Sequence, residues 1–266
     1  MKVLFMVVIF FCLFVTTLAQ HKTYTPSYYK LAIQWPNAVC NQHEYVLGSC
    51  KRPIPQRFTI HGLWGFEEDH KAIPHCKGGD ELQAFEVDYK MDQLKQEWPN
   101  LVGDDFQLWF EQWRKHGRCI NDMTVEKYFN TALDAMGEVG PLVELLLDGI
   151  GLQPQNHRFV KTQDIPSAIE KQLNKIVEVK CNKNKDSQSQ IHEVYFCVSA
   201  QGKLADCAYD SKKLRPPYTT TSCPTEILYP SDPSPPMPPT PLAQFIYGFV
   251  KKLNVAPVYI WLCEET

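Results

Sequence analysis

The chain has 266 residues and a formal net charge of −3, and 44% of its residues are hydrophobic. This length suits one domain with a sizeable core. An acidic chain has no general electrostatic attraction to nucleic acid, which excludes tight, salt-sensitive packaging of RNA but permits transient contact at a local basic site.

The N-terminus has the pattern of a signal peptide. Lys2 precedes an apolar run over residues 3–15, and small residues offer a cleavage site after Ala19. No later stretch is apolar and uncharged over the length that a membrane span needs. We therefore expect residues 1–19 to be removed and the mature chain to be secreted, to the cell exterior or to the vacuole, without a membrane partner.

The cysteines indicate disulfide bonds, because the secretory pathway is oxidising. The chain has ten cysteines. Cys12 leaves with the signal peptide, so an odd number remains. No Cys or His residues have the spacing of zinc ligands, and we expect no metal site.

The mature chain begins with strand-like sequence. Residues 24–36 alternate aromatic or aliphatic with polar side chains, which predicts a half-buried strand stopped by a proline. Residues 58–64 then read Phe-Thr-Ile-His-Gly-Leu-Trp, in which a β-branched run ends in the imidazole of His61, a glycine and Trp64. This stretch is expected to be a strand end that presents chemistry.

Helical patterns fill the middle of the chain. In the second predicted helix, Asp104 or Asp105 is the expected cap, and the helix delivers Lys115 and His116 before it ends at Gly117. The helices are predicted over residues 80–98, 105–115 and 165–173, with two more that begin at Thr124 and Pro141.

Strand-like sequence returns after the helices. The runs 176–179 and 191–198 are rich in β-formers, and a Gln-Gly turn leads from the second into 204–207 as a hairpin. Helices between two sets of strands predict an α+β fold with a central antiparallel sheet and several packed helices.

Two motifs carry a resemblance to a known family. The string Ile-His-Gly-Leu-Trp that ends at Trp64, followed by Trp-x-Lys-His-Gly-x-Cys over 113–119, resembles the two active-site segments of the ribonuclease T2 family. That family includes the S-RNases and S-like ribonucleases of plants. The resemblance covers roughly residues 28–230 and implies a disulfide-stapled α+β ribonuclease.

The resemblance also implies a division of the chain. A T2-like domain is expected over residues 20–230 with its last strand at 227–230, then a proline-rich linker over 231–241 and a tail over 242–266 to which the sequence assigns no role. The implied disulfide bonds are Cys40–Cys50, Cys76–Cys119, Cys181–Cys223 and Cys197–Cys207. Cys263 is left over and could be free, capped or intermolecular; otherwise a monomer is expected.

The chemistry needs few parts, because RNA carries its own nucleophile, the ribose hydroxyl beside the scissile phosphate. Two imidazoles and a cation suffice, with no cofactor. By resemblance, His116 is the general base, His61 the general acid and Lys115 the charge stabiliser, while Trp64 packs at the site. Lys115 as a mere surface charge is the alternative.

The sequence also suggests roles for Gln34 and for the other histidines. Gln34 corresponds to a glutamine that helps to hold a base, yet a Gln on an exposed strand face is an equal alternative. The remaining histidines are interpreted as structural: His21, His43, His70, His75, His157 and His192.

Two neighbouring residues depart from the family pattern, which usually has a glutamate at position 112 and often a histidine at 111. Gln112 is neutral, so it can hold a hydrogen bond but cannot balance an imidazolium at His116. Glu111 lies four residues before Lys115 and can pair with it at the substrate site. The chain is therefore predicted to be an active but attenuated endoribonuclease for single-stranded RNA. The alternative is a storage or recognition protein, including a self-incompatibility role, on the same scaffold.

Overall fold

The structure is a computed structural model that describes residues 22–42, 50–207 and 223–231. The predicted signal peptide, nearly all of the proline-rich linker, and the tail with Cys263 lie outside these residues, as do His21 and His43. Within the described part of the chain, no helix is long and apolar enough to cross a membrane.

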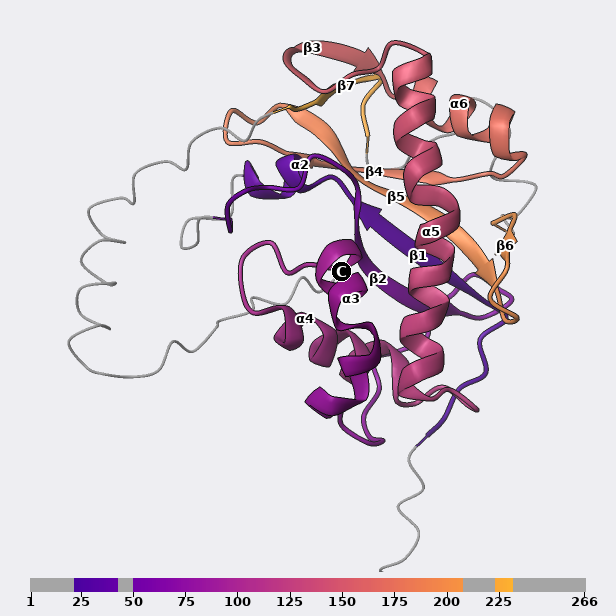
Figure 1. Ribbon diagram of the computed structural model, residues 1–266. Coiled ribbons are helices and arrows are strands. Elements are labelled where there is room, and N and C mark those ends of the chain that lie inside the picture. The colour runs from indigo at the N-terminus through magenta and orange to yellow at the C-terminus, as the bar shows by residue number, and fades with distance from the viewer. Residues whose placement is uncertain (1–21, 43–49, 208–222, 232–266) are drawn as a thin grey trace, which may run out of the picture.

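The described residues form one seven-stranded sheet, with helices packed against it (Figure 1). The strand order is β2-β1-β5-β7-β3, and β4 and β6 also pair with β5. All pairs are antiparallel except a short parallel contact between β5 and β7. The predicted α+β class with an antiparallel sheet is confirmed. The strands are β1 (Tyr28–Gln34), β2 (Thr59–Phe66), β3 (Gln155–Lys161), β4 (Glu178–Lys183), β5 (Ser189–Ser199), β6 (Leu204–Ala205) and β7 (Glu226–Tyr229).

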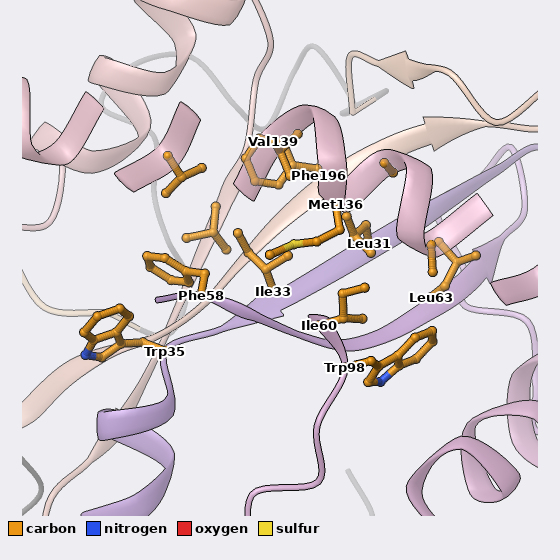
Figure 2. Packing of buried hydrophobic residues seen from close by; sticks show 14 of the residues in the cluster. Leu31, Ile33, Trp35, Phe58, Ile60, Leu63, Trp98, Met136, Val139 and Phe196 are labelled. Atoms are coloured by element: carbon orange, nitrogen blue, oxygen red, sulfur yellow. The ribbon is translucent and has the colours of Figure 1, made fainter. Parts of the chain in front are cut away.

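The core lies between the sheet and one long helix (Figure 2). Leu31 and Ile33 of β1 and Phe196 of β5 are buried against Met136 and Val139 of that helix. The helices are α2 (Pro36–Cys40), α3 (Met91–Glu97), α4 (Asp105–Gln112), α5 (Val125–Gly149) and α6 (Asp164–Leu173), with a 3₁₀ helix η1 (Ala84–Lys90) and a π-helical turn η2 (Trp113–Gly117).

The long helix α5 corrects one prediction. Pro141 does not begin a new helix but lies inside α5, whose buried residues Val139 and Val143 flank it. Burial of one continuous apolar face outweighs the hydrogen bond that a proline removes. The start of α5 is as expected, since Thr124 Oγ1 accepts a hydrogen bond from the amide of Lys127 at 3.1 Å.

Other boundaries also differ from prediction. The helix predicted over 80–98 is a 3₁₀ helix followed by α3, and its Phe85 is 72% exposed rather than packed. The first strand begins at Tyr28, and Pro36 not only stops it but opens the short helix α2. The strand predicted over 176–179 is β4, which continues to Lys183. Neither α2 nor the polar strand β3 was predicted, because neither has a clear apolar period.

Four disulfide bonds staple the described residues, and they join the same pairs that the resemblance implied: Cys40–Cys50, Cys76–Cys119, Cys181–Cys223 and Cys197–Cys207. The second bond ties the loop after β2 to the residues just beyond η2. It therefore fixes a loop next to the segment that carries His116.

Candidate active site

A β-bulge gives His61 its direction. In the β1–β2 ladder, Ala32 pairs with Gly62 and Ile33 with Ile60, so His61 is the extra residue. Because of this extra residue, Ile60 and Leu63 both face the core although they are three residues apart, and His61 lies on the opposite face, where its side chain is 37% exposed. The indole of Trp98 donates to the carbonyl oxygen of His61 at 3.0 Å and holds the bulge.

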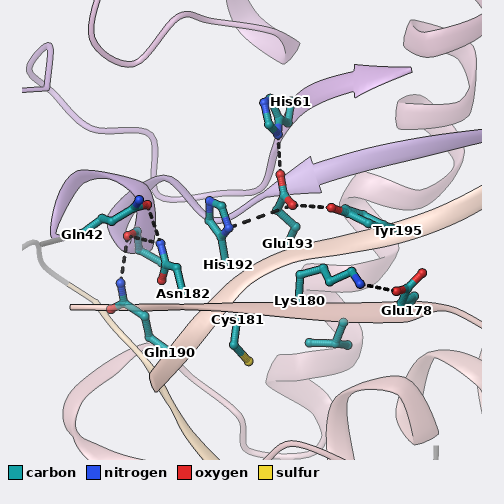
Figure 3. Close-up of polar contacts among 12 residues, drawn as sticks. Gln42, His61, Glu178, Lys180, Cys181, Asn182, Gln190, His192, Glu193 and Tyr195 are labelled. Carbon is teal, nitrogen blue, oxygen red and sulfur yellow. Dashed lines mark hydrogen bonds and ion pairs between the residues drawn. The ribbon is translucent and has the colours of Figure 1, made fainter. Parts of the chain in front are cut away.

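A buried carboxylate contacts His61 from the neighbouring strand β5. Glu193 Oε1 forms a short hydrogen bond with His61 Nδ1, and Glu193 Oε2 accepts a hydrogen bond from the hydroxyl of Tyr195 at 2.6 Å (Figure 3). His192 Nδ1 lies 4.0 Å from the same Oε2 atom. The Glu193 side chain is 6% exposed. The carboxylate thus has its hydrogen-bonding partners inside the protein.

The ion pair shifts the pKa of both groups. Desolvation alone lowers the pKa of His61, but the charge and hydrogen bond of Glu193 outweigh it, so that the pKa of His61 is raised above its ordinary value. Desolvation alone raises the pKa of Glu193, but His61 lowers it well below the usual range. The contact therefore favours the imidazolium form of His61 and the carboxylate form of Glu193.

His116 lies in a different setting, on the π-helical turn. Asp104 caps the helix α4 by accepting a hydrogen bond from the amide of Gln107, and the helix widens after Gln112. In the wider turn the amide of Arg118 donates to the carbonyl oxygen of Trp113. The predicted helix over 105–115 therefore exists, but its last turn, which carries His116, is not α-helical.

Cationic and imidazole groups surround His116. The ring of His75 meets the ring of His116 edge-on, with 5.1 Å between the centroids. Loss of solvent lowers the pKa of His116 first, and His75, Lys115 and His61 lower it further, to about 3. His116 is therefore neutral near pH 7, whereas His61 is held toward its charged form.

Trp64 lies between the two histidines. Its ring centroid is 5.3 Å from that of His61 and 5.8 Å from that of His116. Its Nε1 donates to Gln112 Oε1 at 3.2 Å, and Gln112 is buried. A Cβ at Gly62 would lie 2.4 Å from Trp64 Nε1 and 2.5 Å from Gln112 Oε1, so only glycine leaves room for this hydrogen bond.

One hydroxyl connects the two segments. Tyr128 of α5 donates to the carbonyl oxygen of Leu63 at 3.0 Å and also lies 3.4 Å from the carbonyl oxygen of Gln112. Leu63 belongs to the strand with His61, and Gln112 adjoins the turn with His116. The long helix therefore sets the distance between the two imidazole-bearing segments.

The remaining predicted residues border this group. Glu111 pairs with Lys115 at 3.5 Å, as the spacing predicted, but it also forms a two-pronged ion pair with Arg114 at 2.6 and 3.2 Å. Gln34 is buried and pairs in register with Glu193, so the alternative of an exposed strand residue is wrong. The structure thus brings His61, His116, Trp64 and Gln112 together, with Lys115 and Glu111 beside them.

Sequence reasoning missed three residues of this site. Glu193 and Tyr195 were seen only as part of a strand, although a lone Glu in a β-rich, buried run is itself a signal. His75 was interpreted as structural, yet it precedes Cys76, whose implied bond to Cys119 already placed it near His116. His192, also interpreted as structural, lies at the edge of the site beside Glu193.

Among the described residues, no group of three or more His, Cys, Asp or Glu side chains is arranged to hold a metal ion. The site combines a histidine whose pKa is raised, His61, and a histidine whose pKa is lowered, His116. Both rings contact the indole of Trp64, and the ammonium group of Lys115 lies beside them. Such a set can move one proton onto a substrate and another off it.

The chain is similar to known proteins in both sequence and fold. The model of the Ribonuclease T2 family matches residues 26–207. Intracellular ribonuclease LX of Solanum lycopersicum is 30% identical over 182 residues, which cover 65% of this chain and 74% of the relative. A ribonuclease-like storage protein of Panax ginseng is 31% identical over 190 residues, which cover 68% of this chain and 75% of the relative. The crystal structure of RNase NT in complex with 5'-AMP superposes with a TM-score of 0.66 at 25% identity, over 78% of this chain and 99% of that one.

Proposed function

The chain belongs to the ribonuclease T2 family, and on that basis we propose that it is a secreted endoribonuclease that cleaves single-stranded RNA. The reaction is transphosphorylation to a 2',3'-cyclic phosphate, followed by hydrolysis to a 3'-phosphate. The observation that supports it most is the placement of His61 and His116 on two sides of Trp64, with their pKa values moved in opposite directions.

In the proposed mechanism, neutral His116 takes the proton of the ribose 2'-hydroxyl and that oxygen attacks phosphorus. Protonated His61 gives its proton to the leaving 5'-oxygen, and Lys115 stabilises the charge that builds on the phosphoryl oxygens. In the second step the two histidines exchange roles and water attacks the cyclic phosphate. Trp64, Gln34 and Glu111 are the proposed substrate-binding residues.

The proposed activity is attenuated, because Gln112 is neutral. Its amide oxygen accepts the hydrogen bond of Trp64, so the indole is held in place. A carboxylate at the same position would accept that bond and would also bring negative charge to a site where cations and imidazoles lower the pKa of His116. We thus propose that Gln112 holds Trp64 in position but cannot balance a positive charge on His116.

The second candidate function is non-enzymatic: a storage or recognition protein on a ribonuclease scaffold. Gln112 and the similarity to a ribonuclease-like storage protein favour it. Retention of His61, Lys115 and His116 favours the enzyme. For either function we propose an oxidising destination, outside the cell or in the vacuole, since four disulfide bonds staple the domain.

The test is direct. The purified chain from Gln20 onward, disulfide-bonded and folded, is incubated with a dinucleotide and with RNA at acidic and neutral pH in the presence of a chelator. We expect cleavage through a cyclic phosphate that is lost in a His61→Ala, His116→Ala control. Cleavage no greater than that of the folded control would contradict the enzyme and favour the storage or recognition protein.

A further inference from the structure

A buried carboxylate needs a partner that compensates for its lost hydration. Among the described residues, Glu193 is the only Asp, Glu, Lys or Arg that is buried. Burial of a charge is strongly unfavourable unless hydrogen bonds and an opposite charge offset the lost hydration. Both oxygens of Glu193 are hydrogen-bonded, one to His61 and the other to Tyr195, and the opposite charge available through those bonds is the imidazolium of His61.

The neighbouring strand provides a comparison. Glu178 of β4 is level with Tyr195 in the ladder, and it pairs with Lys30 at 2.9 Å. It also pairs with Lys180 at 2.5 Å (Figure 3). The carboxylate of Glu178, on the same face of the sheet, thus pairs with two lysines. Glu193 instead meets an imidazole whose other nitrogen is free of this contact and can face a substrate.

We propose that Glu193 is a positioning residue for His61: it fixes the proton on Nδ1, directs Nε2 toward the scissile phosphate and favours the imidazolium form, while Tyr195 anchors the second carboxylate oxygen. The catalytic part of this inference rests on the proposed ribonuclease function. The hydrogen of Nδ1 stays between His61 and Glu193 throughout, because which ring nitrogen reacts is determined by the bond that the other makes.

The proton movements balance with this assignment. In the first step the Nε2 proton of His61 passes to the 5'-oxygen as the phosphorus–oxygen bond breaks, and the ribose proton passes to His116. In the second step His61 Nε2 takes a proton from the attacking water, and His116 returns one to the 2'-oxygen as the cyclic bond opens. Glu193 remains a carboxylate in both steps.

Other charged and polar groups around His61 and Glu193 also shift the pKa values of these two residues. Lys115, from the turn η2, lowers the pKa of His61, and His61 and His116 repel each other when both are charged. On the far side of the carboxylate, His192 lowers the pKa of Glu193, as does the hydroxyl of Tyr195. Glu193 is therefore the group that keeps His61 protonated in a site otherwise rich in positive charge.

The decisive variant is Glu193→Gln, which keeps the size and the hydrogen-bonding oxygen but removes the charge. Its matched control is Glu178→Gln, the same change on the adjacent strand. We expect Glu193→Gln to lower kcat by about tenfold to a hundredfold with little change in KM. The alkaline limb of kcat/KM and the NMR titration midpoint of His61 should both move to lower pH, whereas Glu178→Gln should leave that midpoint in place.

A second measurement does not depend on the variant folding. In the unsubstituted protein the His61 Nδ1 proton, held by Glu193, should give a strongly downfield NMR signal that is lost in His61→Ala. Absence of that signal, or an unchanged His61 midpoint in folded Glu193→Gln, would overturn the proposal. If the protein does not cleave RNA but the midpoint still falls in Glu193→Gln, the ribonuclease proposal fails while the positioning of His61 by Glu193 stands.

Discussion

The two histidines of the site have opposite surroundings. His61 is the extra residue of a β-bulge in β2 and is hydrogen-bonded to the buried carboxylate of Glu193. His116 lies on a π-helical turn beside His75 and Lys115, and none of the carboxylates in the described residues appears among the groups that shift its pKa. One imidazole is therefore held toward its charged form, and the other toward its neutral form.

This contrast shows how one side-chain type can supply both an acid and a base. Two titratable groups whose environments push their pKa values apart can hold different protonation states at one pH. We therefore propose His61 as the acid, because Glu193 raises its pKa, and His116 as the base, because burial and neighbouring positive groups lower its pKa.

Removal of either imidazole should have the largest effect. His61→Ala and His116→Ala are each expected to lower kcat/KM for a dinucleotide by about 10²- to 10⁴-fold, because each deletes one proton-transfer group. His70→Ala, which deletes a histidine outside the site, should leave the rate nearly unchanged. Wild-type rates in either active-site variant would contradict the two-histidine mechanism.

Restoring charge beside His116 should have the next largest effect. Gln112→Glu is expected to raise kcat by about a hundredfold. It should also move the acid limb of the pH profile to higher pH, since a nearby negative charge raises the pKa of His116. Gln107→Glu, which adds the same charge at an exposed position of α4, is the control. A turnover of Gln112→Glu within a few-fold of the parent would refute the attenuation.

A change at Gly62 tests the indole that separates the two histidines. Gly62→Ala should displace Trp64 and lower kcat by about tenfold, since small misplacements in a site are costly. The control is Gly137→Ala in α5, where an added Cβ meets nothing within 4 Å. It should leave the rate unchanged and raise the free energy of unfolding by about 0.5–1 kcal/mol. Equal activities of the two variants would show that the placement of Trp64 is irrelevant.

The smallest expected effect concerns His75. His75→Ala removes part of the cover over His116 and also an imidazole whose positive charge, present at acid pH, lowers the pKa of His116; each loss raises that pKa. The NMR midpoint of His116 should therefore rise, while kcat near pH 7 changes by less than about tenfold. An unchanged midpoint would mean that the ring contact carries no electrostatic coupling.

Much of the fold was predictable because it follows from local patterns. The His61 strand, the helix that carries Lys115 and the hairpin near Cys197 all have clear periods or caps in the sequence. The predicted break at Pro141 was wrong, since its outcome depends on burial along the whole of α5 rather than on the proline itself.

The sequence predicted the main residues of the site but not the contact between His61 and Glu193. The motifs identified His61, Lys115 and His116, and the helical spacing identified the contact of Glu111 with Lys115. Glu193 lies 132 residues from His61, so only the strand register brings the two together. The bulge at His61, which lets both Ile60 and Leu63 face the core, is likewise a property of the β1–β2 ladder.

The most direct test of this account is an NMR titration of the two imidazoles in the unsubstituted protein, with the resonances assigned from His61→Ala and His116→Ala. The account predicts that His61 titrates above pH 6.5, the ordinary histidine value, because of Glu193, and that His116 titrates far below it, near pH 3. Two midpoints close to the ordinary value, or a higher midpoint for His116 than for His61, would contradict the assignment of acid and base.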